Sequence, residues 1–223
     1  DRYNATIGTA LQNGTAMNLE SVMAPIHGIS PNEALLYAPA TGVPELRTAW
    51  KEKVLADNPS LAGKPMSLPV VTSGLTHGLS VVADLFVDAD DVMLLPDMIW
   101  GNYKLVFALR RQADFRQYPF FDGDGFHVTA FREALEKTCA ERDKVIVLLN
   151  FPNNPTGYTP TEAEGQAIAD ALIAAADGGT NVVVLTDDAY FSLFYGDTPM
   201  RESIFAKFAG VHPRLLAIKG DAA

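Results

Sequence analysis

Short, continuously apolar runs recur along this chain, and segments with helical spacing of apolar residues separate them. The clearest runs cover residues 92–95, 145–149 and 182–185. A strand that is apolar on both sides is buried on both faces, which is typical of a parallel sheet covered by helices. The pattern therefore predicts an α/β fold, a three-layer α/β/α sandwich with a mostly parallel sheet.

The predicted elements follow from this alternation and from local start and stop signals. A helix is expected after Pro44, which suits a first helical turn. Another helix is expected to open with a capping box from Thr159 to Glu162, with Pro160 at its first position, and to run to about residue 176. The remaining predictions are strands over 68–72, 92–95, 114–118, 144–150, 181–186 and 214–219, and helices over 74–87, 102–110 and 128–141.

The first 42 residues differ from the rest in pattern. They contain turn residues at 13–14, 27–28 and 30–32 and a plausible short strand over 5–7. We expect an N-terminal arm over 1–42 and one large domain over 43–223. Because the chain ends soon after the apolar run at 215–218, and domain boundaries normally fall in exposed polar linkers, we expect it to be a fragment of a longer protein.

Charge and cysteine content exclude several classes of partner. The chain has 17 Lys and Arg against 27 Asp and Glu, a formal net charge of −10. Such a chain has no electrostatic footprint for nucleic acid or for an anionic membrane. Its single cysteine, Cys139, makes no internal disulfide or cysteine-based metal cluster, which fits a reducing compartment and predicts a cytoplasmic location. The four histidines show no metal-ligand spacing, so no metal site is expected.

Polar residues gather where predicted strands end, which is where ligands bind in parallel sheets. Residues 72–76 (TSGLT) run from a predicted strand into a helix, and such a turn either binds phosphate or only caps the helix. Trp100, in a strand–helix loop, forms the flat wall of a site or simply buries area. The turn at 153–157 (NNPTG) delivers two amides, although such turns are often only turns. Asp187 directly follows an apolar strand, where a carboxylate needs a cation or several donors unless it acts as a cap.

Five motifs in chain order carry a resemblance that no one of them carries alone. They are YAPATG at 37–42, SGLT at 73–76, WGN at 100–102, NNPTG at 153–157 and DDAY at 187–190. Together they resemble the class I/II aminotransferases among the fold type I pyridoxal-phosphate enzymes, with motifs most similar to the aspartate and aromatic aminotransferases. The resemblance covers nearly the whole chain, and it implies that 1–42 holds part of the family's small domain and 43–223 its cofactor-binding large domain.

The resemblance implies a role for each candidate residue. Asp187 pairs with the protonated ring nitrogen of pyridoxal 5'-phosphate, Trp100 stacks on the ring, and Asn154 and Tyr190 donate to its phenolic oxygen. Gly74, Leu75 and Thr76 hold the phosphate. Tyr37 reaches the phosphate of a neighbouring subunit, which implies a homodimer, and Gly8 lies near the substrate carboxylate. Of these, Trp100, Asn154, Asp187, Tyr190 and the Gly74 turn are expected to surround a common cavity.

The lysine that binds the cofactor covalently is the main departure from the family pattern. In the family it follows a run of small residues, and residues 220–223 (GDAA) resemble the start of that run. Lys219 precedes the run, so we interpret it as structural and place the reactive lysine just beyond Ala223. Lys219 remains the alternative, because it ends an apolar strand at the predicted site.

The resemblance implies an aminotransferase that moves an amino group from an α-amino acid to a 2-oxo acid. The WGN loop favours aspartate or aromatic substrates. Because a fold and a cofactor do not fix a reaction, two alternatives stay open: a non-catalytic or regulatory cofactor-binding module, and a lyase that uses the same cofactor and fold. Without the reactive lysine, the 223-residue piece itself is expected to be inactive.

Overall fold

The computed structural model describes residues 10–222 and divides the chain between Ala40 and Thr41 into two compact units. The sequence prediction put this boundary after residue 42, and it also proposed a strand over 5–7, which lies outside the described residues. Each unit is described by itself.

The N-terminal unit consists of short elements and buries none of its described residues. A hairpin pairs β1 (Leu11–Gln12) with β2 (Thr15–Ala16), and both turn residues, Asn13 and Gly14, have positive φ. Residues of this type tolerate that backbone conformation, which explains the turn. Three short helical pieces follow: α1 (Glu20–Met23), η1 (Ala24–Gly28) and α2 (Pro31–Leu35). The predicted irregular arm therefore contains local structure that the turn signals alone did not show.

The second unit is built on a five-stranded sheet in the order β4-β3-β7-β8-β9, in which every neighbouring pair is parallel. The strands are β3 (Val92–Pro96), β4 (Asp114–Tyr118), β7 (Lys144–Asn150), β8 (Asn181–Asp187) and β9 (Leu215–Gly220). All of β3, and all of β7 and β8 except their first residues, are buried. The strands predicted over 144–150 and 181–186 are confirmed as β7 and β8, which are parallel neighbours in this sheet.

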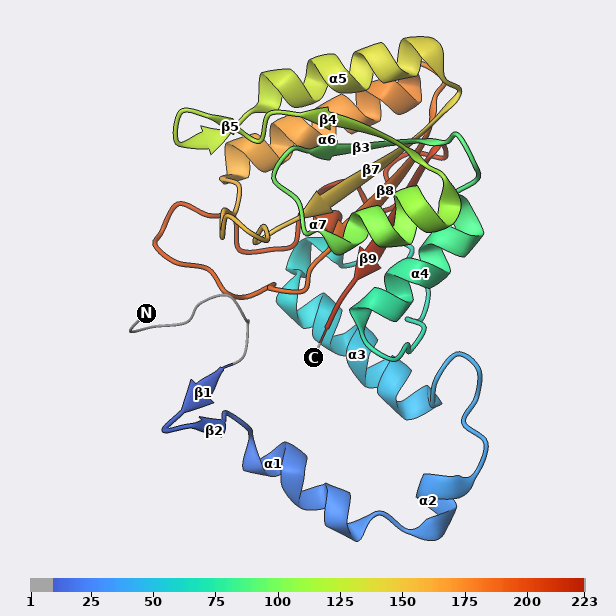
Figure 1. Ribbon diagram of the computed structural model, residues 1–223, viewed down its shortest axis with the longest axis vertical. Helices are drawn as coiled ribbons and strands as arrows, with labels where there is room; N and C mark the ends of the chain where they lie inside the picture. Colours follow the sequence, from blue (N-terminus) through green and yellow to red (C-terminus); the bar gives the residue numbers. More distant parts are fainter. Residues whose placement is uncertain (1–9, 223) are drawn as a thin grey trace. The chain divides into compact units, whose positions relative to one another are not determined.

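Helices cover both faces of this sheet (Figure 1). On one face, α5 (Val128–Glu141) and α6 (Glu162–Asp177) pack on even-numbered residues of β8 such as Val182 and Val184. On the other face, α4 (Leu75–Phe86) and the π-helix η3 (Lys104–Leu109) pack on Val183 and Leu185. Alternating side chains thus supply two separate cores. The three-layer fold predicted from the apolar runs is confirmed.

The remaining elements complete the second unit. α3 (Pro44–Asp57), η2 (Pro59–Leu61) and α7 (Phe205–Phe208) share a third apolar cluster. A small hairpin, β5 (Phe121–Asp122) with β6 (Gly125–Phe126), precedes α5.

Three local predictions need correction. Residues 68–72 are not a strand: Leu68, Val70 and Val71 are exposed, and Pro69 offers no N–H to a ladder. Residues 104–109 are not α-helical but form the π-helix η3.

The capping box of α6 lies two residues later than predicted. Thr161 is the N-cap, its hydroxyl accepts from the N–H of Glu164, and the carboxylate of Glu164 accepts in return from the N–H of Thr161. Glu164 also accepts from the hydroxyl of Tyr158, so this later box has an additional partner.

Candidate active site

The candidate site lies at the carboxyl ends of β3, β7 and β8. The chain passes from β3 outward to β4 and then returns to the opposite side of β3 for β7. The loops after β3 and β7 therefore leave the sheet in diverging directions, and ligands bind at such switch points in open α/β sheets. The loop after β3 carries Trp100 and the loop after β7 carries Asn154.

Asp187, the last residue of β8, carries a buried carboxylate that is 3% exposed. Its Oδ2 accepts from the hydroxyl of Tyr103 at 2.6 Å, and its Oδ1 accepts from the N–H of Ala189 at 3.1 Å. Burial raises the pKa of Asp187, and these two donors oppose that rise. Within residues 10–222, no cationic side chain forms an ion pair with this carboxylate. The Asp187 carboxylate is thus stabilised by two neutral hydrogen-bond donors and not by a cationic side chain.

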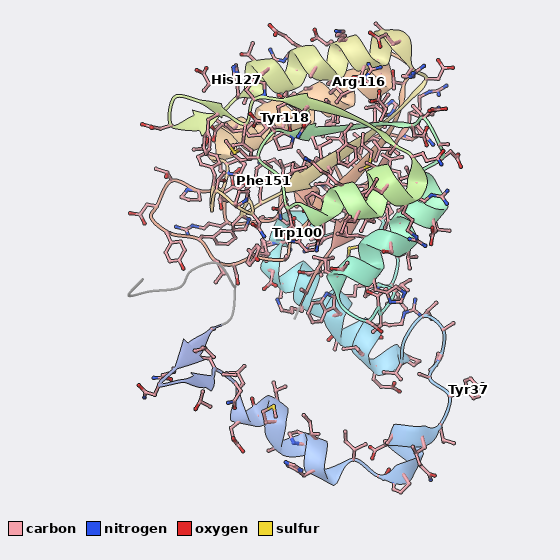
Figure 2. All side chains as sticks on the ribbon, in the orientation of Figure 1. Tyr37, Trp100, Arg116, Tyr118, His127 and Phe151 are labelled. Atoms are coloured by element: carbon pink, nitrogen blue, oxygen red, sulfur yellow. The ribbon has the colours of Figure 1, made fainter. Side chains whose placement is uncertain are left out.

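Tyr103 links Asp187 to Trp100. Its ring is 1% exposed and meets the Trp100 ring edge to face, with centroids 5.5 Å apart. Trp100 itself is half-buried on the loop between β3 and η3, and it is labelled in Figure 2. Burial, together with the charge of Asp187, raises the pKa of Tyr103 above that of an ordinary phenol. The phenol therefore remains a hydrogen-bond donor throughout the physiological pH range.

Asn150 joins Asp187 to the turn that contains Asn154. The side-chain amide of Asn150 donates to the main-chain oxygen of Asp187 at 2.8 Å, and its Oδ1 accepts from the N–H of Asn154 at 2.7 Å. Asn154 in turn donates to the hydroxyl of Tyr190 over a long 3.5 Å. Asn153 is buried, and its Oδ1 accepts from the N–H and the hydroxyl of Thr156, which closes the turn. The NNPTG turn is therefore a scaffold that presents the amide of Asn154.

The predicted phosphate turn sits at the start of α4. Gly74 precedes the helix with φ +79°, a conformation that glycine adopts without strain. In the described part of the chain, no side chain caps this helix end, so the N–H groups of its first turn face outward with the positive end of the helix dipole. Leu75 packs against Gly220, where a Cβ would come within 2.7 Å of the Leu75 Cδ1. Because Gly220 pairs with Asp187 in the sheet, the turn adjoins the Asp187 edge.

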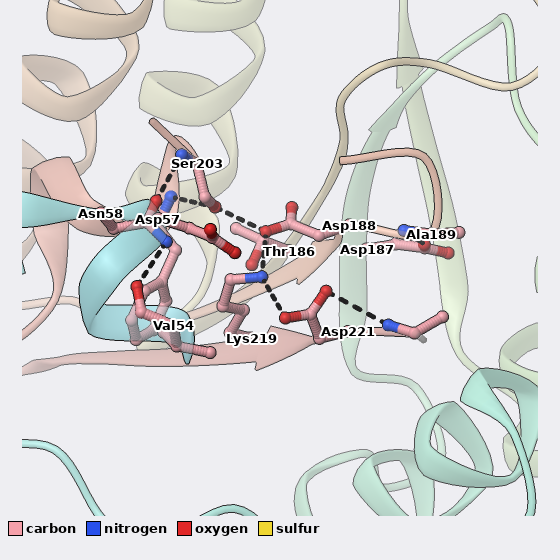
Figure 3. A network of polar contacts seen from close by, with 12 residues as sticks. Val54, Asp57, Asn58, Thr186, Asp187, Asp188, Ala189, Ser203, Lys219 and Asp221 are labelled. Atoms are coloured by element: carbon pink, nitrogen blue, oxygen red, sulfur yellow. Dashed lines mark hydrogen bonds and ion pairs between the residues drawn. The ribbon is translucent and has the colours of Figure 1, made fainter. Parts of the chain in front are cut away.

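Lys219 lies on the other face of the sheet from Asp187. It pairs with Thr186 in the register of β8 and β9, so the side chains of Lys219 and Thr186 point to the same face of the sheet. Figure 3 shows its ammonium between two carboxylates: Nζ is 2.7 Å from Asp188 Oδ2 and 3.0 Å from Asp221 Oδ2. Burial disfavours the ammonium, but the two carboxylates outweigh it and raise the pKa of Lys219.

Asp188 completes this second cluster. Its carboxylate is buried and also accepts from the hydroxyl of Ser203 at 2.6 Å, while the N–H of Ser203 donates to Asn58 Oδ1 at 2.7 Å. Burial raises the pKa of Asp188, and the ammonium of Lys219 opposes that rise. The cluster connects β8 and β9 to α3 through buried polar contacts.

The structure does not bring two of the predicted site residues, Tyr37 and Gly8, together with the others. Tyr37 is fully exposed within the N-terminal unit, and Gly8 lies outside the described residues. A small internal cavity of about 10 Å³ lies under the site, but Tyr103, Tyr118 and Asn150 help to line it, not the residues predicted to share a cavity.

The described residues contain no group of three or more His, Cys, Asp or Glu side chains placed to hold a metal ion. None of their helices is long and apolar enough to cross a membrane.

Sequence reasoning did not identify Tyr103 and Asn150 as site residues. Tyr103 is separated from Asp187 by 84 positions, and Asn150 from the Asp187 main chain by 37. Asn150 carried a usable signal, because an amide at the end of an apolar strand lies at the ligand edge. Tyr103 carried none, because its spacing fits an ordinary core position on a helix.

Comparison with known proteins gives a consistent result. The family model for aminotransferase class I and II matches residues 9–219. Over 171 residues the chain is 32% identical to a probable aspartate/prephenate aminotransferase of Aquifex aeolicus, and over 161 residues it is 27% identical to an aspartate aminotransferase of Bacillus subtilis. Each match covers 72% of this chain, and the chain spans only 38% of either relative.

A solved structure agrees with these sequence relatives. A crystal structure of an aminotransferase from Anaerococcus prevotii superposes with a TM-score of 0.82 at 26% identity, covering 97% of this chain and 53% of that one. The strand-end motifs, the sheet order and these matches lead to one conclusion: this chain belongs to the aminotransferase class I and II family.

Proposed function

We propose that this chain provides the cofactor-binding part of a pyridoxal-phosphate-dependent aminotransferase. The observation that carries the proposal is the carboxylate of Asp187, which is buried and hydrogen-bonded but has no cationic partner in the described part of the chain. A buried carboxylate is costly unless a positive charge compensates it. A protonated pyridine ring nitrogen is a cation of the right kind, so the donor set fits this cofactor.

Pyridoxal phosphate, when bound, supplies an electron sink that depends on a protonated ring nitrogen. Asp187 would hold that proton in place. Trp100 would stack on the ring, Asn154 and Tyr190 would donate to the phenolic oxygen, and the Gly74, Leu75 and Thr76 turn would bind the phosphate. By the family resemblance, we also propose that Tyr37 reaches the phosphate of a neighbouring subunit in a homodimer, and we assign Gly8, which is outside the described residues, to the substrate carboxylate.

We further propose that Lys219 is structural and that the reactive lysine follows Ala223. The support is the pair of carboxylates on Lys219 and its place on the opposite sheet face from Asp187. An ammonium held in this way is a poor nucleophile, because the attacking amine must be neutral. Borohydride reduction of the complete protein with pyridoxal phosphate, followed by peptide mass spectrometry, tests this. Labelling at Lys219 would overturn the assignment.

The proposed reaction moves an amino group from aspartate or an aromatic amino acid to a 2-oxo acid. The WGN loop supports this substrate class, as do relatives named as aspartate and aspartate/prephenate aminotransferases. We place the enzyme in the cytoplasm, which its single cysteine favours.

Amino transfer by the complete protein is the direct test, with aspartate or phenylalanine as donor and 2-oxoglutarate as acceptor. Asp187→Ala should lower kcat by about a hundredfold or more, since it removes a preorganised charge next to the reacting system. Asp124→Ala, a change in the turn between β5 and β6, is the control. Full turnover by Asp187→Ala would show that Asp187 only caps its loop. Light scattering tests the homodimer, and a monomer at micromolar concentration would contradict it.

A further inference from the structure

We infer that Tyr103 is a positioning residue: it fixes the Asp187 carboxylate and the Trp100 ring relative to each other, in the positions that the cofactor ring requires. This inference rests on the proposed function. Its phenol contacts the group assigned to the ring nitrogen, and its ring contacts the group assigned to the ring face. No other described side chain both hydrogen-bonds to the Asp187 carboxylate and packs an aromatic ring on Trp100.

The position of Tyr103 is determined from three sides. Its N–H donates to the main-chain oxygen of Trp100 at 3.1 Å, so the two residues share one turn. Behind it, the Phe107 ring packs at a centroid distance of 6.5 Å from within the π-helix. In front, its hydroxyl reaches Asp187 Oδ2 at 2.6 Å. With the main chain fixed at Trp100, the buried phenol is restricted by its contacts with Phe107 and Asp187.

The hydrogen bond from Tyr103 also affects the charge of Asp187, whose pKa burial raises. A donor to a carboxylate favours its ionised form, which opposes the effect of burial. With one oxygen held by Tyr103 and the other by the N–H of Ala189, the carboxylate is fixed in plane and direction before any cofactor arrives. Such preorganisation is what an electrostatic partner of the ring nitrogen requires.

The variant Tyr103→Phe removes the hydroxyl and keeps the ring against Trp100. Tyr118→Phe is the matched control: Tyr118 is 2% exposed, lines the same small cavity, and its hydroxyl has no hydrogen-bond partner within residues 10–222 (Figure 2). Both changes remove one buried oxygen that borders this cavity. Only Tyr103→Phe removes a contact with Asp187.

The test measures a ratio of dissociation constants on the complete protein. One probe is pyridoxal phosphate, and the other is its analogue with carbon in place of the ring nitrogen. Both carry the same aldehyde and phosphate, so their ratio reports only on the ring nitrogen. Wild type should favour pyridoxal phosphate, and Tyr103→Phe should reduce that preference about tenfold, as expected when a hydrogen bond to a charged group is lost.

The outcomes distinguish a failure of the Tyr103 role from a failure of the proposed function. An unchanged preference in Tyr103→Phe, with a clear preference in wild type, overturns the role of Tyr103 and leaves the proposed function intact. An equal reduction in Tyr118→Phe also overturns it, because a general loosening around the shared cavity would then explain the effect. A wild-type protein that binds both probes equally, or neither, overturns the assignment of Asp187 and this inference with it.

Discussion

Asp187 and Asp188 are consecutive buried residues, yet their carboxylates lie on opposite faces of the sheet and have different partners. Asp188, on the face of α5 and α6, has an internal cation in Lys219. Asp187, on the face of α4, has two neutral donors, Tyr103 and Ala189, and no cation among the described residues. Asp188 therefore belongs to a closed structural cluster, whereas Asp187 is left with a charge that a ligand can complete.

The difference shows how adjacent residues of one type divide between stability and function. Removing one partner of a buried ion pair leaves the other as an uncompensated buried charge. Single substitutions in the Asp188 cluster are therefore expected to lower the stability of the protein. Asp187 already lacks such a partner, so the protein without cofactor loses little when its charge is removed. Four measurements on the complete, cofactor-free protein test this contrast.

The largest effect is expected from Lys219→Met. It leaves Asp188 buried without its cation and should lower the free energy of unfolding by about 3–5 kcal/mol. Lys53→Met, which removes the more exposed Lys53–Asp57 pair on α3, should cost less than about 1 kcal/mol. Urea denaturation measures both. Similar losses for the two variants would remove the distinction between the Asp188 cluster and a surface pair.

Next in size is the difference between two amide substitutions. Asp188→Asn leaves Lys219 with Asp221 alone and should cost about 2 kcal/mol more than Asp187→Asn, which removes an uncompensated charge. Unfolding free energies at pH 7 give this difference. An equal cost would mean that Asp187 has a cationic partner outside residues 10–222.

A smaller effect is expected in how the free energy of unfolding depends on pH. Burial raises the pKa of Asp187, so the native state keeps a proton that the unfolded chain releases near pH 4. The free energy of unfolding should therefore fall as pH rises from about 4, by up to about 1.4 kcal/mol per unit of pKa difference. Asp187→Asn should flatten this slope, measured by urea denaturation at several pH values. A slope identical to wild type would show that Asp187 is not the titrating group.

Asp221→Asn should give the smallest effect. Asp221 is the second partner of Lys219, at 3.0 Å and less buried than Asp188, so its removal should cost about 1 kcal/mol or less. A loss as large as that of Asp188→Asn would shift the main compensation of Lys219 to Asp221.

The sequence was sufficient for the sheet but not for every element. β7 and β8 were predictable because burial on both faces requires an unbroken apolar run. The run at 68–72 looks similar, yet the N–H of Val71 bonds to Thr41 outside any strand ladder. The α6 cap was misplaced because two threonines precede the helix, and Tyr158, which bonds Glu164 from outside the box, is not part of the local pattern.

The site divides in the same way. The position of Asp187 and Asn154 at one edge was predictable because strand ends of a parallel sheet meet there. The contact of Tyr103 with Asp187 depends on how the π-helix packs on β8, which no local spacing encodes. The separation of Lys219 from Asp187 depends on register, because a shift of one residue between β8 and β9 would move Lys219 to the other face.

The strand order also determines when the site can form during synthesis. β3 and β4 emerge first and can pair only with each other, because β7, the other neighbour of β3, is made about fifty residues later, as the Met93–Ile146 pairing shows. β8 then adds beside β7. The loop of Trp100 and Tyr103 is therefore translated long before Asp187, and it has no carboxylate to bind until two further strands have joined the sheet. A ribosome paused before β8 would hold a nascent chain with both aromatic rings present and their partner still untranslated.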